Sequence, residues 1–498
     1  MLDELKSRIR DVDLLGKVMD AEDTVRKFVV GSKVIAISGM VGTGYPKVVP
    51  KAMSEYVEKT GEKFNVVVYG AGTVGVDLEE HLAKIGIRRR FPIGASAEVT
   101  RRLVNSREFE AYDMWLTEYT RWLREDVLAR KFGSIDIAVI EATGVTEEGL
   151  VLGTSVDASP IFIEKARGVI VELSLIKPYM LGLHDIYIPR VNEILPIRSV
   201  LDRIGDKVVK IPKSKIMAIV PSTVDDQRGA YSPGSDIDRK VVENIVDFLS
   251  KEASEDPNLR TEYVTMQPAA GPIASLLADK IHEVGFSLSI WGEVASVRWL
   301  KTLSGNVKAI SGSAIYTLPG DEKLREEFYG NIDEFRDRVV LRPQAISNSP
   351  EVISRFYHIN VQQAIEVDVY GQVNITYIGD RFMVGVGGSG DHAKPSYITI
   401  VALPSITGSG IPRVVPLVYH TDLADHDVDV IVTDQGWADL RGLSPLEKAK
   451  VIIEKCAHPS YKDMLWDYLE TVSRKVGHRP VDFRKALEFR EKFTAKGS

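Results

Sequence analysis

The sequence predicts an α/β protein made of two domains, each built on a largely parallel sheet. Short apolar runs rich in β-branched residues alternate along the chain with longer stretches that have the 3.6-residue period of amphipathic helices. This alternation is typical of parallel strands joined by helices. The chain has 498 residues, which is more than one hydrophobic core usually organises, so two domains are expected.

The first half of the chain shows this alternation clearly. The apolar run FNVVVYG at 64–70 predicts a strand that ends in glycine, and VDLEEHLAKIG at 76–86 follows it with helical spacing. The same kind of run predicts three more strands, at 135–145, 168–175 and 215–222. The stretch DIDRKVVENIVDFLSKEA at 236–253 has the period of a surface helix.

A polar segment divides the two predicted domains. Residues 223–236 read TVDDQRGAYSPGSD and are rich in turn-forming residues. We therefore predict one domain over residues 1–225 and a second over residues 226–498. The two halves follow a similar pattern without a strict repeat, so we interpret them as two versions of one fold.

After this segment the alternation resumes. The sequence predicts a strand running into a loop at 282–293, and a hairpin over 367–379 that turns at Gly371. Two further strands and one amphipathic helix are expected, at 397–405, 427–436 and 443–459. The helix begins at a Ser-Pro pair, which is a common start signal.

Bulk composition excludes several classes of function. The net charge is −7, whereas proteins that bind nucleic acid usually carry a basic excess. One cysteine, Cys456, allows neither an intrachain disulfide nor a multi-thiolate metal site. The close pair His420 and His426 falls in a predicted polar loop, and we expect no metal site there.

The N-terminal region and the hydropathy pattern give an expectation about location. The first 15 residues mix both charge signs and lack an apolar signal segment. No apolar run approaches the roughly 20 residues needed to span a bilayer. We expect a soluble, cytoplasmic protein without a membrane or nucleic-acid partner.

Three glycine-rich stretches follow strand-like runs, at 38–53, 69–77 and 384–396. Glycines at such junctions either shape tight turns or let backbone N–H groups approach an anion closely. In the third stretch, four glycines fall within six residues: Gly385, Gly387, Gly388 and Gly390. This density costs backbone entropy, and one function that offsets such a cost is an amide aimed at a reacting carbonyl oxygen.

The second glycine-rich stretch raises a cofactor alternative. Gly70, Gly72 and Gly75 satisfy the Gly-x-Gly-x-x-Gly pattern of dinucleotide sites, which also needs an acidic residue roughly 20 residues later. The corresponding region instead holds Arg88, Arg89 and Arg90. Arginines could bind a 2′-phosphate, so an NADP-binding oxidoreductase stays open as an alternative.

One carboxylate stands at an unusual place. In FSLSIWGEVASVRW at 286–299, Glu293 comes directly after the glycine that ends an apolar, alternating run. A solvated charge at the end of a strand is one interpretation, and a nucleophile is the other. The local sequence does not decide between them.

Several motifs, in order, resemble the acetyl-CoA hydrolase/transferase family of coenzyme A transferases. They are GMVGTGYPK (39–47), LRPQAISNSPEVI (341–353), VGVGGSGD (384–391) and VTDQGWADLRGLSP (432–445). The resemblance extends from about residue 30 to about residue 475. It implies two similar α/β domains of the coenzyme A transferase type, with the active site between them, and a homodimer.

The resemblance also implies roles for individual residues. The family's catalytic glutamate segment matches WGEVAS, which assigns the nucleophile to Glu293. Oxyanion donors match Ala270, in QPAAGPIA, and Gly388. Residues implied to bind coenzyme A or the substrate carboxylate are Arg228, Asn348, Asp434, Gly387, Gly390 and Gly271.

Three positions depart from the family pattern. Asp434 stands where the family usually has glutamate, and His392 stands where an aromatic residue is expected. The segment LPSITGSGIP at 403–412 lacks an expected lysine. These departures concern the acyl preference and the details of coenzyme A binding.

The implied reaction is covalent transfer with ping-pong kinetics. Glu293 attacks an acyl-CoA, and a mixed anhydride and then a glutamyl-CoA thioester follow. No metal or cofactor is required, because coenzyme A is itself a substrate. Succinyl-CoA and acetate are the favoured pair; the alternatives are acetyl-CoA hydrolysis and transfer from butyryl- or 4-hydroxybutyryl-CoA to acetate.

Overall fold

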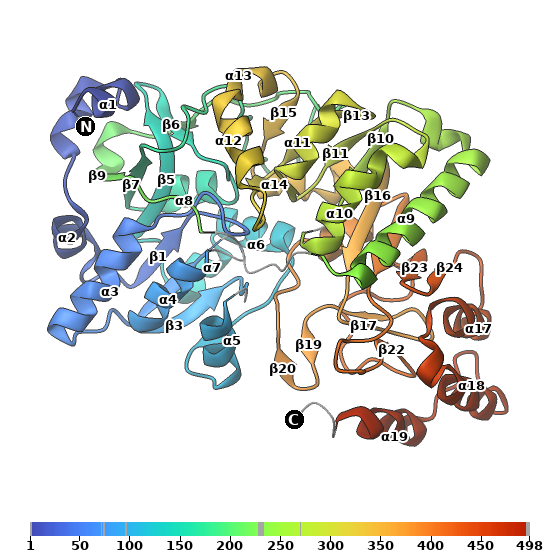
Figure 1. Cartoon of the computed structure of the whole chain (residues 1–498). Helices are drawn as coiled ribbons and strands as arrows, with labels where there is room; N and C mark the ends of the chain where they lie inside the picture. Colours follow the sequence, from blue (N-terminus) through green and yellow to red (C-terminus); the bar gives the residue numbers. More distant parts are fainter. Residues whose placement is uncertain are drawn as a thin grey trace.

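A computed structural model describes residues 2–70, 72, 75–94, 97–227, 234–268 and 270–494. Two large sheets organise the chain, one of nine strands and one of eight (Figure 1). The strands of the first sheet lie between Val34 and Ser222, and those of the second lie between Val264 and Asp439. The predicted α/β class is confirmed.

The first sheet is mostly parallel, with the order β4-β3-β2-β1-β5-β6-β8, and β7 pairs with β5 and β9. Its parallel strands are β1 (Val34–Ile37), β2 (Val66–Tyr69), β3 (Ile87–Phe91), β4 (Glu110–Ala111), β5 (Ile137–Val145), β7 (Gly168–Ser174) and β9 (Ile216–Ser222). The antiparallel strands are β6 (Gly149–Leu152) and β8 (Val209–Lys210). Every residue of β1, β2, β5 and β7 is buried, as expected for parallel strands covered on both faces.

Helices connect and cover these strands. They are α1 (Leu2–Arg8), α2 (Ala21–Thr24), α3 (Val48–Thr60), α4 (Val76–Lys84), α5 (Glu98–Asn105), α6 (Leu116–Arg124), α7 (Val127–Phe132) and α8 (Ser159–Lys165). The strands predicted at 64–70, 135–145, 168–175 and 215–222 and the helix predicted at 76–86 are all confirmed.

The second sheet has the order β15-β13-β11-β10-β16-β21-β23-β24 and is parallel except for β24. Its strands are β15 (Val339–Leu341), β13 (Val307–Gly312), β11 (Leu288–Trp291), β10 (Val264–Gln267), β16 (Tyr357–Gln363), β21 (Ile398–Ala402), β23 (Val430–Thr433) and β24 (Gly436–Asp439). The longest helix, α9 (Asp236–Glu255), begins with a capping box between Ser235 and Asp238.

Shorter elements complete this half. The additional helices are α10 (Pro272–Lys280), α11 (Arg298–Lys301), α12 (Glu322–Gly330), α13 (Ile332–Phe335), α14 (Gln344–Ser347), α15 (Pro350–Ile353), α16 (Ser389–Ala393), α17 (Pro445–Cys456), α18 (Pro459–Ser473) and α19 (Phe483–Thr494). Small strand pairs involve β12 (Val294–Ser296), β14 (Ala314–Tyr316), β17 (Glu366–Asp368), β18 (Val373–Asn374), β19 (Tyr377–Ile378), β20 (Arg381–Phe382) and β22 (Val414–Val415).

The local predictions for the second half also hold. The antiparallel pair β17 and β18 forms the predicted hairpin, and Gly371 lies at its turn with φ of 94°. Helix α17 begins directly after Ser444, whose side chain forms a capping box with Glu447. Cys456 is buried at the end of this helix, where burial raises the pKa of its thiol, so it is a packing residue.

The two halves are joined by more than the connecting segment. One hydrophobic cluster contains residues of both large sheets. The amide of Val156 donates to the carbonyl of Ser313 at 2.8 Å, and the amide of Asp185 donates to that of Leu341 at 2.9 Å. The domain boundary at residue 225 therefore stays a prediction, although no strand of either large sheet crosses it.

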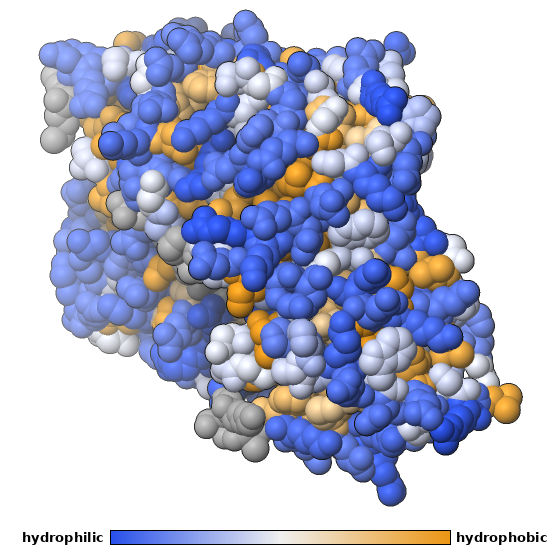
Figure 2. Space-filling model, turned by 45° about the vertical axis from the view of Figure 1, so that its right-hand side comes forward, coloured by the Kyte–Doolittle hydropathy of each residue, from blue (hydrophilic) through white to orange (hydrophobic). Residues whose placement is uncertain are grey.

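The face shown in Figure 2 is mainly hydrophilic, and its hydrophobic residues occur in small groups. None of the helices in the described ranges is both long and apolar enough to cross a bilayer.

Candidate active site

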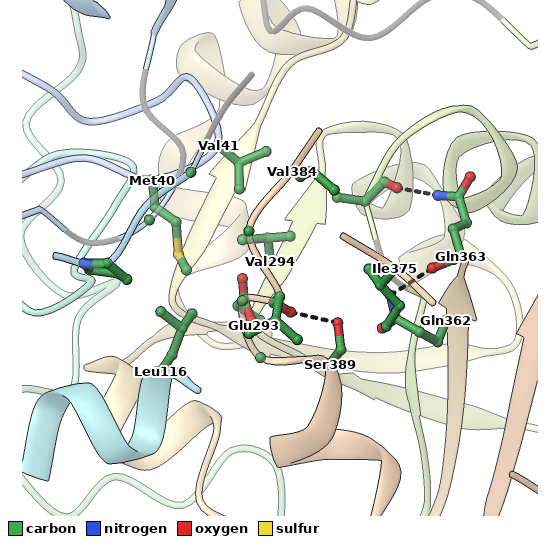
Figure 3. A pocket seen from close by; sticks show the side chains of 18 of the residues that line it. Met40, Val41, Leu116, Glu293, Val294, Gln362, Gln363, Ile375, Val384 and Ser389 are labelled. Atoms are coloured by element: carbon green, nitrogen blue, oxygen red, sulfur yellow. Dashed lines mark hydrogen bonds between the residues drawn. The ribbon is translucent and has the colours of Figure 1, made fainter. Parts of the chain in front are cut away.

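A pocket of about 360 Å³ lies between the two halves. Figure 3 shows that Met40 and Leu116 lie on one side of Glu293, and that Ile375 and Val384 lie on the opposite side. The first pair comes from the N-terminal half and the second pair from the C-terminal half. The pocket is therefore formed jointly, and most of its walls are apolar or backbone.

Glu293 stands in the short link between β11 and β12, where its backbone is fixed on both sides. Its amide donates to Gln267 Oε1 at 3.1 Å, and its carbonyl accepts from the amide of Ser313 at 2.8 Å. A Cβ on Gly292 would overlap Gln267 Oε1, so a larger residue there would displace the acceptor of the Glu293 amide. The link thus holds the backbone and leaves the carboxyl group directed into the pocket.

The Glu293 carboxyl group is partly exposed to the pocket and otherwise enclosed. Asn348 Nδ2 donates to Glu293 Oε2 at 3.0 Å, and the amide of Gly388 also donates to this carboxylate. The pKa of Glu293 is raised to about 7. Burial is the main cause and the charge of Asp391 adds to it, whereas the hydrogen bonds from Asn348 and Gly388 partly offset the rise. The group can therefore be an ionised nucleophile at neutral pH while remaining poorly solvated.

The third glycine-rich stretch contacts this carboxylate closely. Gly387 has φ of 57°, a conformation that glycine adopts at little cost. A Cβ on Gly388 would overlap both Glu293 Oε2 and Asn348 Nδ2. The structure thus brings Glu293, Gly387, Gly388 and Asn348 together, whereas Gly390 lies one step away, packed against the ring of Trp115.

Ala270 and Gly271 lie on another wall of the pocket or beside it. Ala270 lines the pocket, and its carbonyl accepts a hydrogen bond from Gln363 Nε2. Gly271 precedes α10 with φ of 105°, and its amide donates to Tyr316 Oη at 3.3 Å. Both predicted residues therefore lie near the pocket, and no hydrogen bond joins either of them to Glu293 within the described part of the chain.

Two predicted binding residues are not placed at the carboxylate. Asp434 accepts from the amide of Ser405 at 2.6 Å and from its hydroxyl at 3.1 Å, and it is not among the residues that line this pocket. It fixes the segment that includes residues 403–412, the segment lacking an expected lysine. Arg228 lies outside the described residues.

His392, which stands where an aromatic residue is expected, packs against a second histidine. His392, in α16, lies against His358 with ring centroids 5.5 Å apart, and His392 Nδ1 is 3.3 Å from His358 Nε2. Both rings are fully buried, and burial lowers the pKa of each. They are neutral packing groups behind the glycine-rich stretch.

Sequence reasoning did not assign roles to several residues that shape the site. Gln267 and Asp391 stand inside motifs that the sequence singled out, so only their roles were missed. Met40 also belongs to such a motif and lines the pocket. Leu116, which lines the pocket, and Asp113, which accepts from the amide of the pocket residue Val386, carried no local signal, because they meet the C-terminal half only in the folded protein.

In the structure, two glycines of the dinucleotide pattern line the pocket or permit close packing. Gly72 lines the pocket, and a Cβ on Gly75 would overlap the ring of Tyr45, so this glycine permits close packing. Arg90 is buried and forms an ion pair with Glu79. Arg90 is therefore unavailable to a 2′-phosphate, which removes one of the three arginines from the NADP interpretation.

Within the described ranges, His420 and His426 do not combine with acidic side chains into a metal site. No group of three or more potential ligand side chains is found there. His420 Nε2 lies 2.9 Å from Asp422 Oδ1, and His426 is exposed. The chemistry of the pocket described here is that of a carboxylate, amide donors and apolar walls.

Comparisons with known proteins find relatives over the whole chain. The acetyl-CoA hydrolase/transferase N-terminal domain model matches residues 3–221, and the corresponding C-terminal domain model matches residues 325–469. The chain is 38% identical to the succinyl-CoA:acetate CoA-transferase of Clostridium kluyveri, over 99% of this chain and 92% of that protein. It is 33% identical to the acetyl-CoA hydrolase of Schizosaccharomyces pombe, over 99% and 98% of the two chains.

Solved structures share the fold at lower identity. RipA from Yersinia pestis aligns with a TM-score of 0.69 at 18% identity, covering 95% of this chain and 99% of that one. The 4-hydroxybutyrate CoA-transferase of Porphyromonas gingivalis aligns with a TM-score of 0.61 at 19% identity, covering 94% and 99%.

Proposed function

Since the chain belongs to the acetyl-CoA hydrolase/transferase family of enzymes, we propose that it transfers coenzyme A between an acyl-CoA and a small carboxylate. Succinyl-CoA and acetate are the proposed pair, as in the clostridial relative's name. Glu293 is the proposed nucleophile, and coenzyme A is a substrate that becomes bound to it covalently.

One observation carries this proposal. The Glu293 carboxylate reaches a pocket between the halves and is held there by Asn348 and by the amide of Gly388. Within the described residues this carboxylate forms no ion pair, so no cation there neutralises its negative charge. A solvated charge at the end of a strand would need neither the glycine contacts nor the buried amide.

In each step of the proposed reaction, one bond to a carbonyl carbon forms and another breaks. A Glu293 carboxylate oxygen bonds to the acyl carbonyl carbon, the carbon–sulfur bond breaks, and coenzyme A leaves as a thiolate. The thiolate then bonds to the carboxyl carbon of Glu293, and the original acyl group departs as a carboxylate. The acceptor carboxylate reverses these steps on the glutamyl-CoA thioester, which gives ping-pong kinetics.

Backbone amides stabilise the negative charge that develops in these steps. The Gly388 amide already donates to Glu293, so it can follow that oxygen when the glutamyl carbonyl becomes tetrahedral. Ala270 is the proposed donor to the acyl oxygen, on the opposite wall. Losing one such donor typically costs about 3 kcal/mol, or roughly a hundredfold in rate.

The remaining predicted residues are proposed to hold coenzyme A and the carboxylate. They are Arg228, Asn348, Asp434, Gly387, Gly390 and Gly271. Coenzyme A offers many contacts away from the reacting sulfur, and these can be used to orient the thioester against Glu293. A homodimer is also proposed, and sedimentation of the purified protein tests it.

Two other activities use the same nucleophile. Fungal relatives are named acetyl-CoA hydrolases, in which water would replace the acceptor carboxylate. The apolar wall formed by Met40, Val41 and Leu116 favours an aliphatic acyl group, such as butyryl, as a further donor. Product analysis with and without acetate separates hydrolysis from transfer.

Intact-mass measurement tests the proposed function directly. Incubation with acyl-CoA should add the mass of coenzyme A, less water, to the protein, and borohydride should convert the loaded Glu293 to an alcohol. Glu293→Gln should abolish both, whereas Glu147→Gln, at an exposed carboxylate, should leave them unchanged. Transfer by Glu293→Ala within about tenfold of the original rate would exclude the nucleophile role.

A further inference from the structure

The glycine-rich loop at residues 384–391 is held mainly from the other half of the molecule. It carries the Gly388 amide, which donates to Glu293. Its partners in the N-terminal half lie within residues 92–117, which also contribute Leu116 to the pocket. The contacts between these two segments form three groups, and they involve the two ends of the loop.

The first contact comes from a carboxylate of the N-terminal half. Both carboxylate oxygens of Asp113 accept from the amide of Val386, each at 3.0 Å. This amide lies two residues before Gly388. Burial raises the pKa of Asp113 to about 7, while the bond from Val386 lowers it.

In the second contact the carboxylate belongs to the C-terminal half and the donors belong to the N-terminal half. Asp391 is buried in the C-terminal half and accepts from the amide of Thr117 at 3.0 Å and from its hydroxyl. Helix α6 has no side-chain cap from its own N-cap residue, Trp115. Asp391 therefore caps this helix from the other half of the molecule.

Asp391 also shares a donor with the nucleophile. The side chain of Asn348 hydrogen-bonds to Asp391, and its Nδ2 donates to Glu293 Oε2. An amide nitrogen has two N–H groups, so one amide can serve both carboxylates. Asp391 therefore helps to orient Asn348, together with the Ser347 hydroxyl, which donates to Asn348 Oδ1 at 2.8 Å.

The third group consists of close packing at two glycines and of hydrogen bonds just before the loop. A Cβ on Gly385 would overlap the carbonyl oxygen of Ile93, and a Cβ on Gly390 would overlap the ring of Trp115. Just before the loop, Asn105 exchanges two hydrogen bonds with the backbone of Phe382, at 2.9 and 3.0 Å. The loop is therefore fitted against the N-terminal half at both of its ends, around residues 385–386 and 390–391.

We propose that Asp113 and Asp391 are positioning residues that clamp the glycine-rich loop between the two halves. Through this clamp the Gly388 amide and the Asn348 side chain meet Glu293 in the arrangement that the reaction needs. The inference rests on the proposed function for its kinetic consequence. The clamp itself rests only on the contacts between the halves.

Four variants separate positioning from a merely structural role. Asp113→Ala removes the acceptor for Val386, whereas Asp113→Asn keeps one, so the amide variant should rescue the alanine variant. Asp391→Asn places a second amide nitrogen opposite Asn348 and should turn that side chain away from Glu293. Gly385→Ala should push the loop off Ile93.

The kinetic readout is transfer from acyl-CoA to acetate together with coenzyme A loading in a single turnover. Asp113→Ala, Asp391→Asn and Gly385→Ala should lower kcat by about tenfold to a hundredfold and change the KM for acyl-CoA by less than about threefold. Asp113→Asn should stay within about threefold of the original enzyme. Unchanged kcat in Asp113→Ala and Asp391→Asn, or equal loss in Asp113→Asn, would overturn the proposal.

Hydrogen exchange of the amides of 384–391 gives a readout that does not depend on the chemistry. Exchange should accelerate in Asp113→Ala and Asp391→Asn but not in Glu293→Gln, and global unfolding curves identify any variant that fails to fold. If the original protein never acquires coenzyme A, the proposed function fails, and exchange alone decides the clamp. Unchanged exchange in both variants refutes it.

Discussion

Replacing Glu293 by glutamine should make the protein more stable at pH 8, although this residue lies at the centre of the site. Burial raises the pKa of Glu293 from its usual 4.5 to about 7. Above pH 7 the folded protein therefore holds a poorly solvated charge, whereas the unfolded chain ionises the same group freely. Glutamine has nearly the same shape and never carries that charge.

The size of the effect follows from the two pKa values. The gap between 4.5 and about 7 corresponds to about 3 kcal/mol of unfolding free energy. The sign is the reverse of the usual carboxylate case, because the folded state binds the proton more tightly. The penalty is complete above pH 7 and disappears as the pH falls toward 4.5, so about 1 kcal/mol or less remains at pH 5.

Urea unfolding at pH 5 and pH 8 measures this difference. Glu293→Gln should gain about 3 kcal/mol at pH 8 and about 1 kcal/mol or less at pH 5. Glu147→Gln, at an exposed carboxylate, controls for the loss of one negative charge. A Glu293→Gln protein that is no more stable than this control at pH 8 would show that the carboxylate is well solvated, and the reasoning about its pKa would be wrong.

Three further predictions concern the same framework. The kcat/KM for acyl-CoA should rise with pH to a plateau above about 7, because Glu293 must be ionised. Asn348→Ala should move the midpoint of this profile to higher pH, because it removes a hydrogen bond that lowers the pKa of Glu293. Gly388→Ala should fold but lose transfer by about a hundredfold or more, since its Cβ would overlap Glu293 Oε2; transfer within tenfold of the original would contradict this. Asp226→Asn should lower the unfolding free energy by about 3–5 kcal/mol in urea melts, because it leaves two buried lysines facing one carboxylate fewer; a loss below about 1 kcal/mol would show that solvent reaches the cluster.

Much of the fold could be predicted because its signals are local. The run FNVVVYG becomes β2 with its terminal glycine, and the apolar stretch before Glu293 becomes β11. The Ser-Pro start of α17 is a capping signal that needs no tertiary partner. The placement of Glu293 just beyond a parallel strand was likewise readable, since strands of such sheets end at the edge where binding loops gather.

The polar stretch at 223–236 shows where local reasoning stops. Its composition predicted a polar segment between the domains, yet the Asp226 side chain is only 9% exposed and forms ion pairs with Lys47 at 2.6 Å and Lys177 at 2.7 Å. Both lysines also pair with Glu141. The partners lie far away in sequence, so only the tertiary structure reveals that this aspartate anchors the segment to the first sheet.

The same limit applies within the site. Asn348 and Gly388 were assigned through resemblance, and their contacts with Glu293 are visible only once β11, α14 and the glycine-rich loop come together. Asp113 follows no motif, and its partner Val386 lies 273 residues away. Pairing across such distances has no periodic signal in either segment.

Ionisation of the proposed nucleophile and the contact between the two halves are linked through one side chain. Asn348 donates to Glu293 and also hydrogen-bonds to Asp391, which holds Thr117 of the N-terminal half. Whatever releases Asp391 from Thr117 changes the acceptor that faces Asn348, and therefore the hydrogen bond that lowers the pKa of Glu293. By linkage, protonating Glu293 must in turn change how tightly the halves hold each other. The proposed transfer needs an ionised Glu293, and this link makes the ionisation of Glu293 depend on the contact between the halves.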